Sequence, residues 1–142
     1  MTASERAAQI WPILVLCAAR RETLTYDLLG RLIGVPAQGL GQLLEPIQSY
    51  CLLEALAPLT ALVVNQTTGL PGDGFIGASD VPRAQADVYS RDWLSDNPPD
   101  AEALRLASEG MVARRAREER SRIAKTLKSR STRLRRTRGT RR

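Results

Sequence analysis

The chain has 142 residues, of which 43% are hydrophobic and only 4% aromatic, and its formal net charge at pH 7 is +6. This length suits one ordinary domain with an appendage, and a core of Leu, Val, Ile and Ala favours a mainly α (α+β) fold. Histidine is absent, which excludes Ser–His and Cys–His nucleophilic catalysis and histidine-ligated metal sites.

A first helix is expected from about Ser4 to Arg20. Its apolar positions recur at helical spacing and should face the core; they are Ala7, Ile10, Trp11, Leu14, Val15 and Ala18. Pro12 removes a backbone donor inside this segment, which predicts a kink or a new helical start. Polar residues interrupt the N-terminal segment and its apolar run is short. We therefore expect a cytoplasmic protein with no secretory signal and no membrane partner.

A second helix is expected from Tyr26 to Ile33, capped by Thr25 and ended by Gly34. Its predicted buried face consists of Leu28, Leu29, Leu32 and Ile33. Pro36 suits the first turn of a third helix, and Pro46 is expected to start another helical piece. The tight link between the second and third helices resembles a helix-turn-helix. The two cysteines, Cys17 and Cys51, are too few for a zinc site and are expected to be small core residues.

A strand is expected over Leu59–Asn65, where branched residues lie between Pro58 and a Gly-rich stretch. The following Thr67–Gly74 segment has the composition of a turn or wing, with Phe75 and Ile76 as a returning strand. Because Lys125 is the first lysine of the chain, the Gly-rich segment lacks the lysine of a phosphate-binding loop. Helices followed by a strand and a Gly-rich wing are the order of a winged helix, expected over residues 1–78.

Two further helices are expected in residues 79–112, packed on the winged-helix unit. Asp80 should cap the first of them, with Pro82 in its first turn and with Tyr89 and Trp93 on one side as packing residues. The last helix should start near Asp100. It is expected to continue to Lys128 once its charge is neutralised, with a thin apolar stripe. That stripe comprises Val112, Ala116, Ile123 and Leu127.

The positive charge lies entirely in the C-terminal segment. Residues 1–112 carry seven arginines and no lysine against thirteen acidic residues, whereas residues 113–142 carry fourteen Lys and Arg against Glu118 and Glu119. A segment so charged and so poor in apolar residues should have no fixed structure from Arg130 onward when free. Arginine-rich segments bind phosphate well, which favours a nucleic-acid-binding arm. The alternatives are an extension that solubilises the protein or adheres to ribosomes, and an arm that folds onto the acidic body. The predicted phosphate-binding residues are Arg114, Arg115, Arg117, Arg120, Arg122, Lys125, Lys128, Arg130, Arg133, Arg135, Arg136 and Arg138.

From Ile10 to Phe75 the chain resembles the winged-helix domain of the O6-alkylguanine-DNA alkyltransferases and their alkyltransferase-like relatives. Thr25-Tyr26-Asp27-Leu28 is similar to the family's Thr-Tyr-Gly-Glu helix start, and Gln38-Gly39-Leu40-Gly41 to its Arg-Ala-Val-Gly helix. The segment from Leu59 to Val64, followed by Gly69, is similar to the family's Pro-Cys-His-Arg-Val-Val segment and glycine turn. The resemblance implies a winged-helix fold of bacterial type, with Tyr26 near a target phosphate.

The chain departs from the family at the positions that perform alkyl transfer. Thr60 stands where the family has its nucleophilic cysteine and Ala61 where it has histidine, so neither thiolate nor base is present. Gln38 replaces the arginine that fills the hole left by a flipped nucleotide, and Leu62 replaces the arginine after the histidine. Alkyl transfer is therefore excluded, and base flipping is not expected to follow the family's mode.

The leading hypothesis is a non-enzymatic nucleic-acid-binding protein, with DNA favoured over RNA and with no metal or cofactor. The basic tail would supply the affinity and the body the position. The helical region Pro36–Leu56 contains no basic residue, so it alone should bind a duplex weakly. Gln38 and Gln42 would contact base edges once the tail holds the polymer, or are simply solvated. One alternative is an antitoxin-like or adaptor module whose acidic body binds a basic protein partner, and a further one is an enzyme using Tyr26, Asp73 and Asp80.

Overall fold

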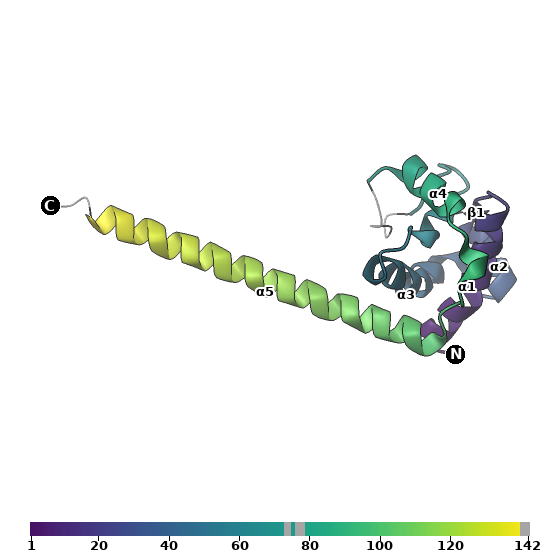
Figure 1. Ribbon diagram of the computed structural model, residues 1–142, viewed down its shortest axis with the longest axis horizontal. Helices are drawn as coiled ribbons and strands as arrows, with labels where there is room; N and C mark the ends of the chain where they lie inside the picture. Colours follow the sequence, from purple (N-terminus) through teal and green to yellow (C-terminus); the bar gives the residue numbers. More distant parts are fainter. Residues whose placement is uncertain (73–74, 76–78, 140–142) are drawn as a thin grey trace. The chain divides into compact units, whose positions relative to one another are not determined.

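The computed structural model describes residues 1–72, 75 and 79–139, and it is mainly helical (Figure 1). The chain divides into two compact units, Met1–Glu109 and Gly110–Arg142. The first unit combines helices with a two-stranded parallel sheet, and the second consists of the greater part of one long helix. Within the described ranges, no helix is both long enough and apolar enough to cross a membrane.

α1 (Ala3–Ala19) forms one wall of the core. Its first turn is closed by a capping box in which Thr2 and Glu5 bond each other's backbone N–H. The buried positions are those that the helical spacing predicted: Ala7, Ile10, Trp11, Leu14, Val15 and Ala18. Of the two outcomes predicted at Pro12, a kink or a new helical start, the new start is wrong, because α1 continues through it. Pro12 lies on the exposed side of α1, where water can solvate the carbonyl that loses its donor.

α2 (Tyr26–Ile33) has the predicted ends. The Thr25 hydroxyl accepts a hydrogen bond from the Leu28 backbone at 3.2 Å, and Gly34 closes the helix with a left-handed φ of 74°. Its buried face differs from the prediction, since Leu28 is 46% exposed and Leu32 is 57% exposed. The helix is short and presents only one narrow side to the core, so two of the four predicted core residues remain on the surface.

α3 (Leu40–Leu53) is one continuous helix that packs against α1. It starts later than predicted, because Pro36 precedes a short 3₁₀ turn, η1 (Ala37–Gly39). Pro46 lies inside α3 and starts no new piece. On the buried side of α3, Cys51 is almost fully enclosed, and desolvation raises the pKa of its thiol from 9.0 to about 11. Cys17 is less enclosed, and desolvation raises the pKa of its thiol as well.

The predicted strand Leu59–Asn65 is mostly a 3₁₀ helix. η2 (Leu59–Leu62) buries four consecutive side chains, and only β2 (Val63–Val64) is extended. An extended strand points alternate side chains to opposite faces, so a turn serves better where every side chain must enter one core. β2 pairs in parallel with β1 (Leu24–Thr25), with Leu24 opposite Val63. The only sheet in the described residues is thus a parallel pair rather than a wing hairpin.

The segment after β2 turns back on itself. The Asn65 N–H donates to the Leu70 carbonyl and the Gly69 N–H donates to the Asn65 carbonyl, both at 2.8 Å. Phe75 belongs to no strand, contrary to the prediction, while Asp73, Gly74 and Ile76 lie outside the described residues.

α4 (Val81–Ser90) begins as predicted, with Asp80 accepting a hydrogen bond from the Arg83 N–H. Trp93 is not on this helix but in η3 (Trp93–Ser95), so the expected Tyr89–Trp93 pairing along one helix is wrong. Instead Trp93 packs edge-on against Trp11, with ring centroids 5.8 Å apart, and donates to the Val88 carbonyl at 2.8 Å. The packing role expected for Trp93 is confirmed.

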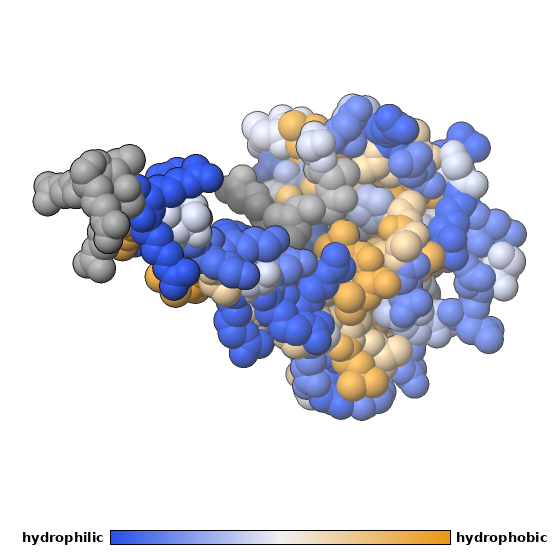
Figure 2. Space-filling model, turned by 60° about the vertical axis from the view of Figure 1, so that its left-hand side comes forward, coloured by the Kyte–Doolittle hydropathy of each residue, from blue (hydrophilic) through white to orange (hydrophobic). Residues whose placement is uncertain are grey.

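α5 (Ala101–Gly139) begins in the first unit and makes up the described part of the second. At the start of α5, Asp100 accepts a hydrogen bond from the Ala103 N–H at 2.8 Å. The prediction of no fixed structure from Arg130 is wrong for residues 130–139, which are helical. On the face of the first unit that Figure 2 shows, hydrophilic side chains border a band of hydrophobic ones.

Candidate nucleic-acid interface

Three of the residues singled out in the sequence lie around two cavities of the first unit. Tyr26 starts α2, Gln38 lies in η1 and Gln42 in the first turn of α3. Tyr26 and Gln42 line one cavity, and Tyr26 and Gln38 line a second. The half-buried ring of Tyr26 therefore belongs to both, while Gln38 and Gln42 are exposed. The fold brings these three side chains into one neighbourhood.

The first cavity has a volume of about 460 Å³. Its wall combines apolar and polar groups of the first unit: Tyr26, Gly41, Gln42, Leu44, Glu45, Gln48, Thr60, Gly72 and Phe75. The volume is within the range of small-molecule sites, which are concave and mainly apolar with a few convergent polar groups. The composition suits a small, largely apolar ligand that makes a few hydrogen bonds.

Tyr26 ties the loop after β2 to this cavity. Its phenol oxygen accepts a hydrogen bond from the Gly72 N–H at 2.8 Å. A Cβ added at Gly72 would lie only 3.0 Å from the same oxygen, so glycine permits this close approach. The hydroxyl expected near a target phosphate is thus already an acceptor in the structure, although its proton can still be donated outward.

Thr60 contributes a buried hydroxyl to the wall of the cavity. The residue is 5% exposed, and its Oγ1 forms no hydrogen bond with any described residue. A hydroxyl becomes an effective nucleophile when an adjacent base removes its proton. In the described part of the chain no base is hydrogen-bonded to Thr60.

Glu45 lies on the same wall and holds two hydroxyl groups. One carboxylate oxygen accepts from Ser49 Oγ at 2.6 Å and the other from Ser108 Oγ at 2.5 Å. Both of its oxygens are therefore engaged within the first unit, where they connect α3 to the start of α5. This arrangement indicates a structural role for Glu45.

Gln48 is the lining residue that sequence reasoning missed. It is 8% exposed and follows the buried Leu44 by one helical turn on α3. The sequence did contain a signal for it, because Gln48 continues the four-residue spacing of the core residues Leu40 and Leu44. Polar side chains seldom occupy such core positions without a specific contact.

The second cavity, of about 440 Å³, is more open and more polar in composition. Its lining residues are Tyr26, Asp27, Ala37, Gln38, Asn65, Gln66 and Thr67. Carboxamide and hydroxyl groups can bond base edges, sugars and phosphates alike. Among the described residues, no lysine or arginine lines either cavity, so these linings supply no strong electrostatic attraction to phosphate.

The second unit contains most of the cations. From Arg114 to Arg136 every residue is exposed. Among the described residues of this unit, ion pairs form only between Arg114 and Glu118 and between Arg122 and Glu119. The following cations have no ionic partner in the described structure: Arg115, Arg117, Arg120, Lys125, Lys128, Arg130, Arg133, Arg135 and Arg136. The side chain of Arg138 lies outside the described residues.

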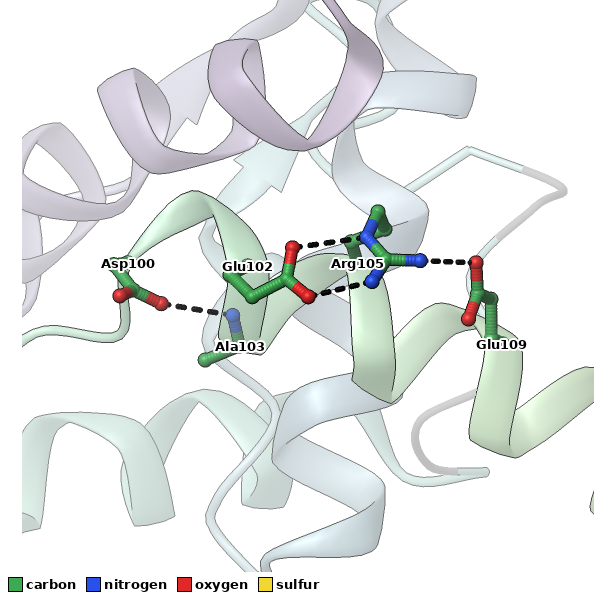
Figure 3. Close-up of polar contacts among 5 residues, drawn as sticks. All are labelled: Asp100, Glu102, Ala103, Arg105 and Glu109. Carbon is green, nitrogen blue, oxygen red and sulfur yellow. Dashed lines mark hydrogen bonds and ion pairs between the residues drawn. The ribbon is translucent and has the colours of Figure 1, made fainter.

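The beginning of α5 shows the opposite arrangement. Arg105 binds Glu102 through two nitrogens, at 2.5 and 3.0 Å, and Glu109 through a third at 2.6 Å (Figure 3). The hydrogen bond from Arg105 lowers the pKa of the Glu102 carboxyl. The cation of the first turns is thus paired within the protein, whereas most of those farther along α5 are free to bind external anions.

Two further findings bear on identity. Among the described residues, no group of three or more Cys, Asp or Glu side chains is placed to hold a metal ion. Comparisons of the chain with models of protein families, with curated proteins and with solved structures found no match.

Proposed function

We propose that this protein is a non-enzymatic nucleic-acid-binding protein of winged-helix type, with DNA as its polymer. In this proposal the cations of α5 supply the affinity, and the face of the first unit that carries Tyr26, Gln38 and Gln42 supplies the position. The observation that carries the proposal is the row of nine exposed Lys and Arg side chains that have no ionic partner among the residues the structure describes.

The physical argument rests on charge and length. Unpaired arginines gain from phosphate because they displace condensed counterions and can grip two oxygens at once. The helix from Arg114 to Arg136 rises about 33 Å at 1.5 Å per residue, close to one turn of B-form DNA at about 34 Å. A cationic helix of this length can therefore span one turn of a duplex and reach phosphates along it.

The experiment is fluorescence anisotropy of a labelled random duplex, with its single strand alongside, at several salt concentrations. The test variant replaces Arg130, Arg133, Arg135 and Arg136 with glutamine in the full chain. Each lost phosphate contact should reduce the slope of log K against log salt by about 0.9 for a duplex. We expect a slope shallower by about 3 to 4 and weaker binding at low salt.

A matched control removes the same charge from the first unit, at Arg20, Arg21, Arg31 and Arg83. These arginines are exposed, and their loss should leave the salt slope nearly unchanged. Equal effects of the two variants would refute a specific role of α5. Absence of binding by the unmodified protein at any salt concentration would reject the proposal and favour the protein-interaction alternative.

The role of the first unit is tested with Gln38→Ala and Gln42→Ala together. Amide side chains release no counterions, so affinity should fall a few-fold at constant salt slope. Gln9→Ala, an exposed glutamine of α1, is the control. No loss of affinity in the double variant would remove the cavity region from the interface.

A further inference from the structure

The second unit carries an apolar stripe along its cationic helix. Four of its side chains are large and exposed: Val112 at 65%, Ile123 at 51%, Leu127 at 60% and Leu134 at 66%. Together with the exposed Ala116 they form what we call the tail stripe. Isolated apolar side chains on a surface need no explanation, but a regular row of them does.

The spacing of the tail stripe is regular. Its members follow one another at intervals of four and seven residues, so the pattern repeats after eleven. Eleven residues make almost three whole turns of an α-helix. With about 100° per residue, all five side chains fall within an arc of about 60°, and the stripe runs nearly straight along α5.

Cations border the stripe on both sides. Arg115, Arg122 and Arg133 lie along one border and Arg120 along the other, by the same helical arithmetic. Glu119 lies on the first border as well, where it pairs with Arg122 at 3.3 Å, so the remaining arginines give the borders their net positive charge. Arg130 lies within the stripe, between Leu127 and Leu134. Figure 2 shows hydrophilic side chains covering most of this helix, with hydrophobic ones between them.

The end of the stripe contains a groove. Leu127, Arg130, Ser131, Leu134 and Arg135 line a concave space of about 450 Å³. The leucines supply an apolar wall and the arginines supply donors, so the groove suits an apolar side chain that lies beside a carboxylate.

We propose that the tail stripe binds an acidic amphipathic helix of another protein, coiled along α5 with an 11-residue repeat. Apolar side chains of the partner would pack between those of the stripe, its flanking Glu and Asp would face the bordering arginines, and one carboxylate would meet Arg130. This site goes beyond the proposed binding of nucleic acid, with which it shares Arg130 and the arginines that border the stripe.

The width and charge of the stripe favour this partner over other occupants. An arc of about 60° is the narrow seam of a helix pair, whereas helices that lie in a membrane surface present a wider apolar face. A second copy would bring together two C-terminal segments, residues 113–142, that each carry fourteen Lys and Arg against two Glu, so their repulsion disfavours it. Among the helices that lie wholly in the described part of the first unit the longest is the 17-residue α1, whose apolar face is already buried, so it offers no free apolar face to the stripe.

Like charges opposed across a helix pair are destabilising, and opposite charges beside the seam choose the partner and its orientation. A polar residue within the seam also fixes the register. Arg130 is such a residue, and its complement is an acid. Charge complementarity therefore identifies the partner as acidic.

The probe is a synthetic acidic peptide of three 11-residue repeats, with leucine at the seam, glutamate at the flanks and one glutamate within the seam. A control peptide of equal charge has serine in place of leucine. Anisotropy at physiological ionic strength should show at least about tenfold tighter binding of the leucine peptide to the full chain. Equal binding of the two peptides would mean attraction by charge alone and would overturn the proposal.

Two pairs of variants locate the site. Ile123→Gln with Leu127→Gln should weaken binding of the leucine peptide at least about tenfold, whereas Ala113→Gln with Ala124→Gln, off the stripe, should not. Arg130→Glu should weaken it more than Arg136→Glu, which makes the same charge change on the opposite side. Helical circular dichroism and duplex binding are recorded for every variant, so loss of the helix or of the proposed function is seen separately.

Two other outcomes would assign the stripe to another occupant. The first outcome has two parts: phosphatidylserine vesicles bind the unmodified protein but not the Ile123/Leu127 variant, and the leucine peptide binds both proteins equally. This result would assign the stripe to membrane surfaces. In the second outcome, sedimentation shows dimers of the unmodified protein but not of the Ile123/Leu127 variant, and the leucine peptide again binds both equally. This result would assign the stripe to a second copy of the chain. Either result would overturn the proposal.

Discussion

The buried hydroxyl of Thr60 makes the first cavity testable by stability. An unsatisfied hydroxyl in an apolar environment costs about 1 to 3 kcal/mol, and Thr60 is 5% exposed with no hydrogen-bond partner for Oγ1 among the described residues. Thr60→Val replaces that hydroxyl with a methyl group of similar volume. The free energy of unfolding should therefore rise by about 1 kcal/mol or more.

The assay is urea denaturation followed by tryptophan fluorescence. Trp11 and Trp93 are the two tryptophans of the chain, and both lie in the first unit, so the signal reports that unit alone. The denaturation midpoint of Thr60→Val should increase without a change in the m-value.

Thr60→Ser provides the control. It retains the hydroxyl and removes a buried methyl group, so stability should fall by about 1 kcal/mol. A Thr60→Val protein less stable than the unmodified one would refute the reasoning, because it would show that Oγ1 has a partner whose hydrogen bond is lost.

Three further predictions concern the first unit. Ser108→Ala should lower the free energy of unfolding by about 1 to 2 kcal/mol, because it removes a hydrogen bond to the Glu45 carboxylate. In a double-mutant cycle with Glu45→Gln, measured by urea denaturation, the two losses of stability should be non-additive. Additive losses would contradict a direct contact. Burial raises the pKa of Cys51 from 9.0 to about 11, so the unfolded chain releases this proton first and stability should fall by up to about 2.7 kcal/mol as pH rises through that window. Cys51→Ala should show a smaller fall, and parallel pH profiles would disprove the attribution. Gly34→Ala should cost about 1 kcal/mol by thermal denaturation, because φ at this position is 74°; an unchanged midpoint would be inconsistent with the left-handed helix end.

The sequence was most informative where one periodicity extended over several turns. All six core positions expected in α1 are buried, because a 17-residue helix with a regular apolar side has one way to face a core. The ends of α2 were equally readable, since Thr25 and Gly34 act through local backbone chemistry. The core-facing side of α2 could not be predicted in the same way, because burial of Leu28 and Leu32 depends on which neighbouring elements contact so short a helix.

The strand prediction failed because composition could not distinguish two ways of burying a short apolar run. Leu59–Val64 is fully buried, and branched residues favour a strand. The core takes consecutive side chains from Leu59 to Leu62 on one side, which requires a 3₁₀ turn. Only the last two residues find a strand partner, at Leu24–Thr25, and no local signal gives that long-range pairing.

The candidate site was partly foreseen. Tyr26, Gln38 and Gln42 were singled out for separate reasons, and the fold brings them around two adjoining cavities. The sequence could not show that the Tyr26 hydroxyl binds Gly72, 46 residues away. Nor could it show that Gln48 faces the same cavity, because its neighbours there come from three other segments of the chain.

The tail illustrates how charge and periodicity answer different questions. Net charge and low hydropathy predicted no fixed structure from Arg130, since too little apolar surface is present to offset the entropy of ordering. The helix nevertheless continues to Gly139, and its residues from Ala113 onward include no glycine before that point and no proline, so nothing local breaks it. An exposed helix of this kind gains its stability when a partner neutralises its cations or covers its stripe. The same unpaired arginines that make the isolated helix costly to maintain are therefore the groups through which phosphate or acidic partners would stabilise it.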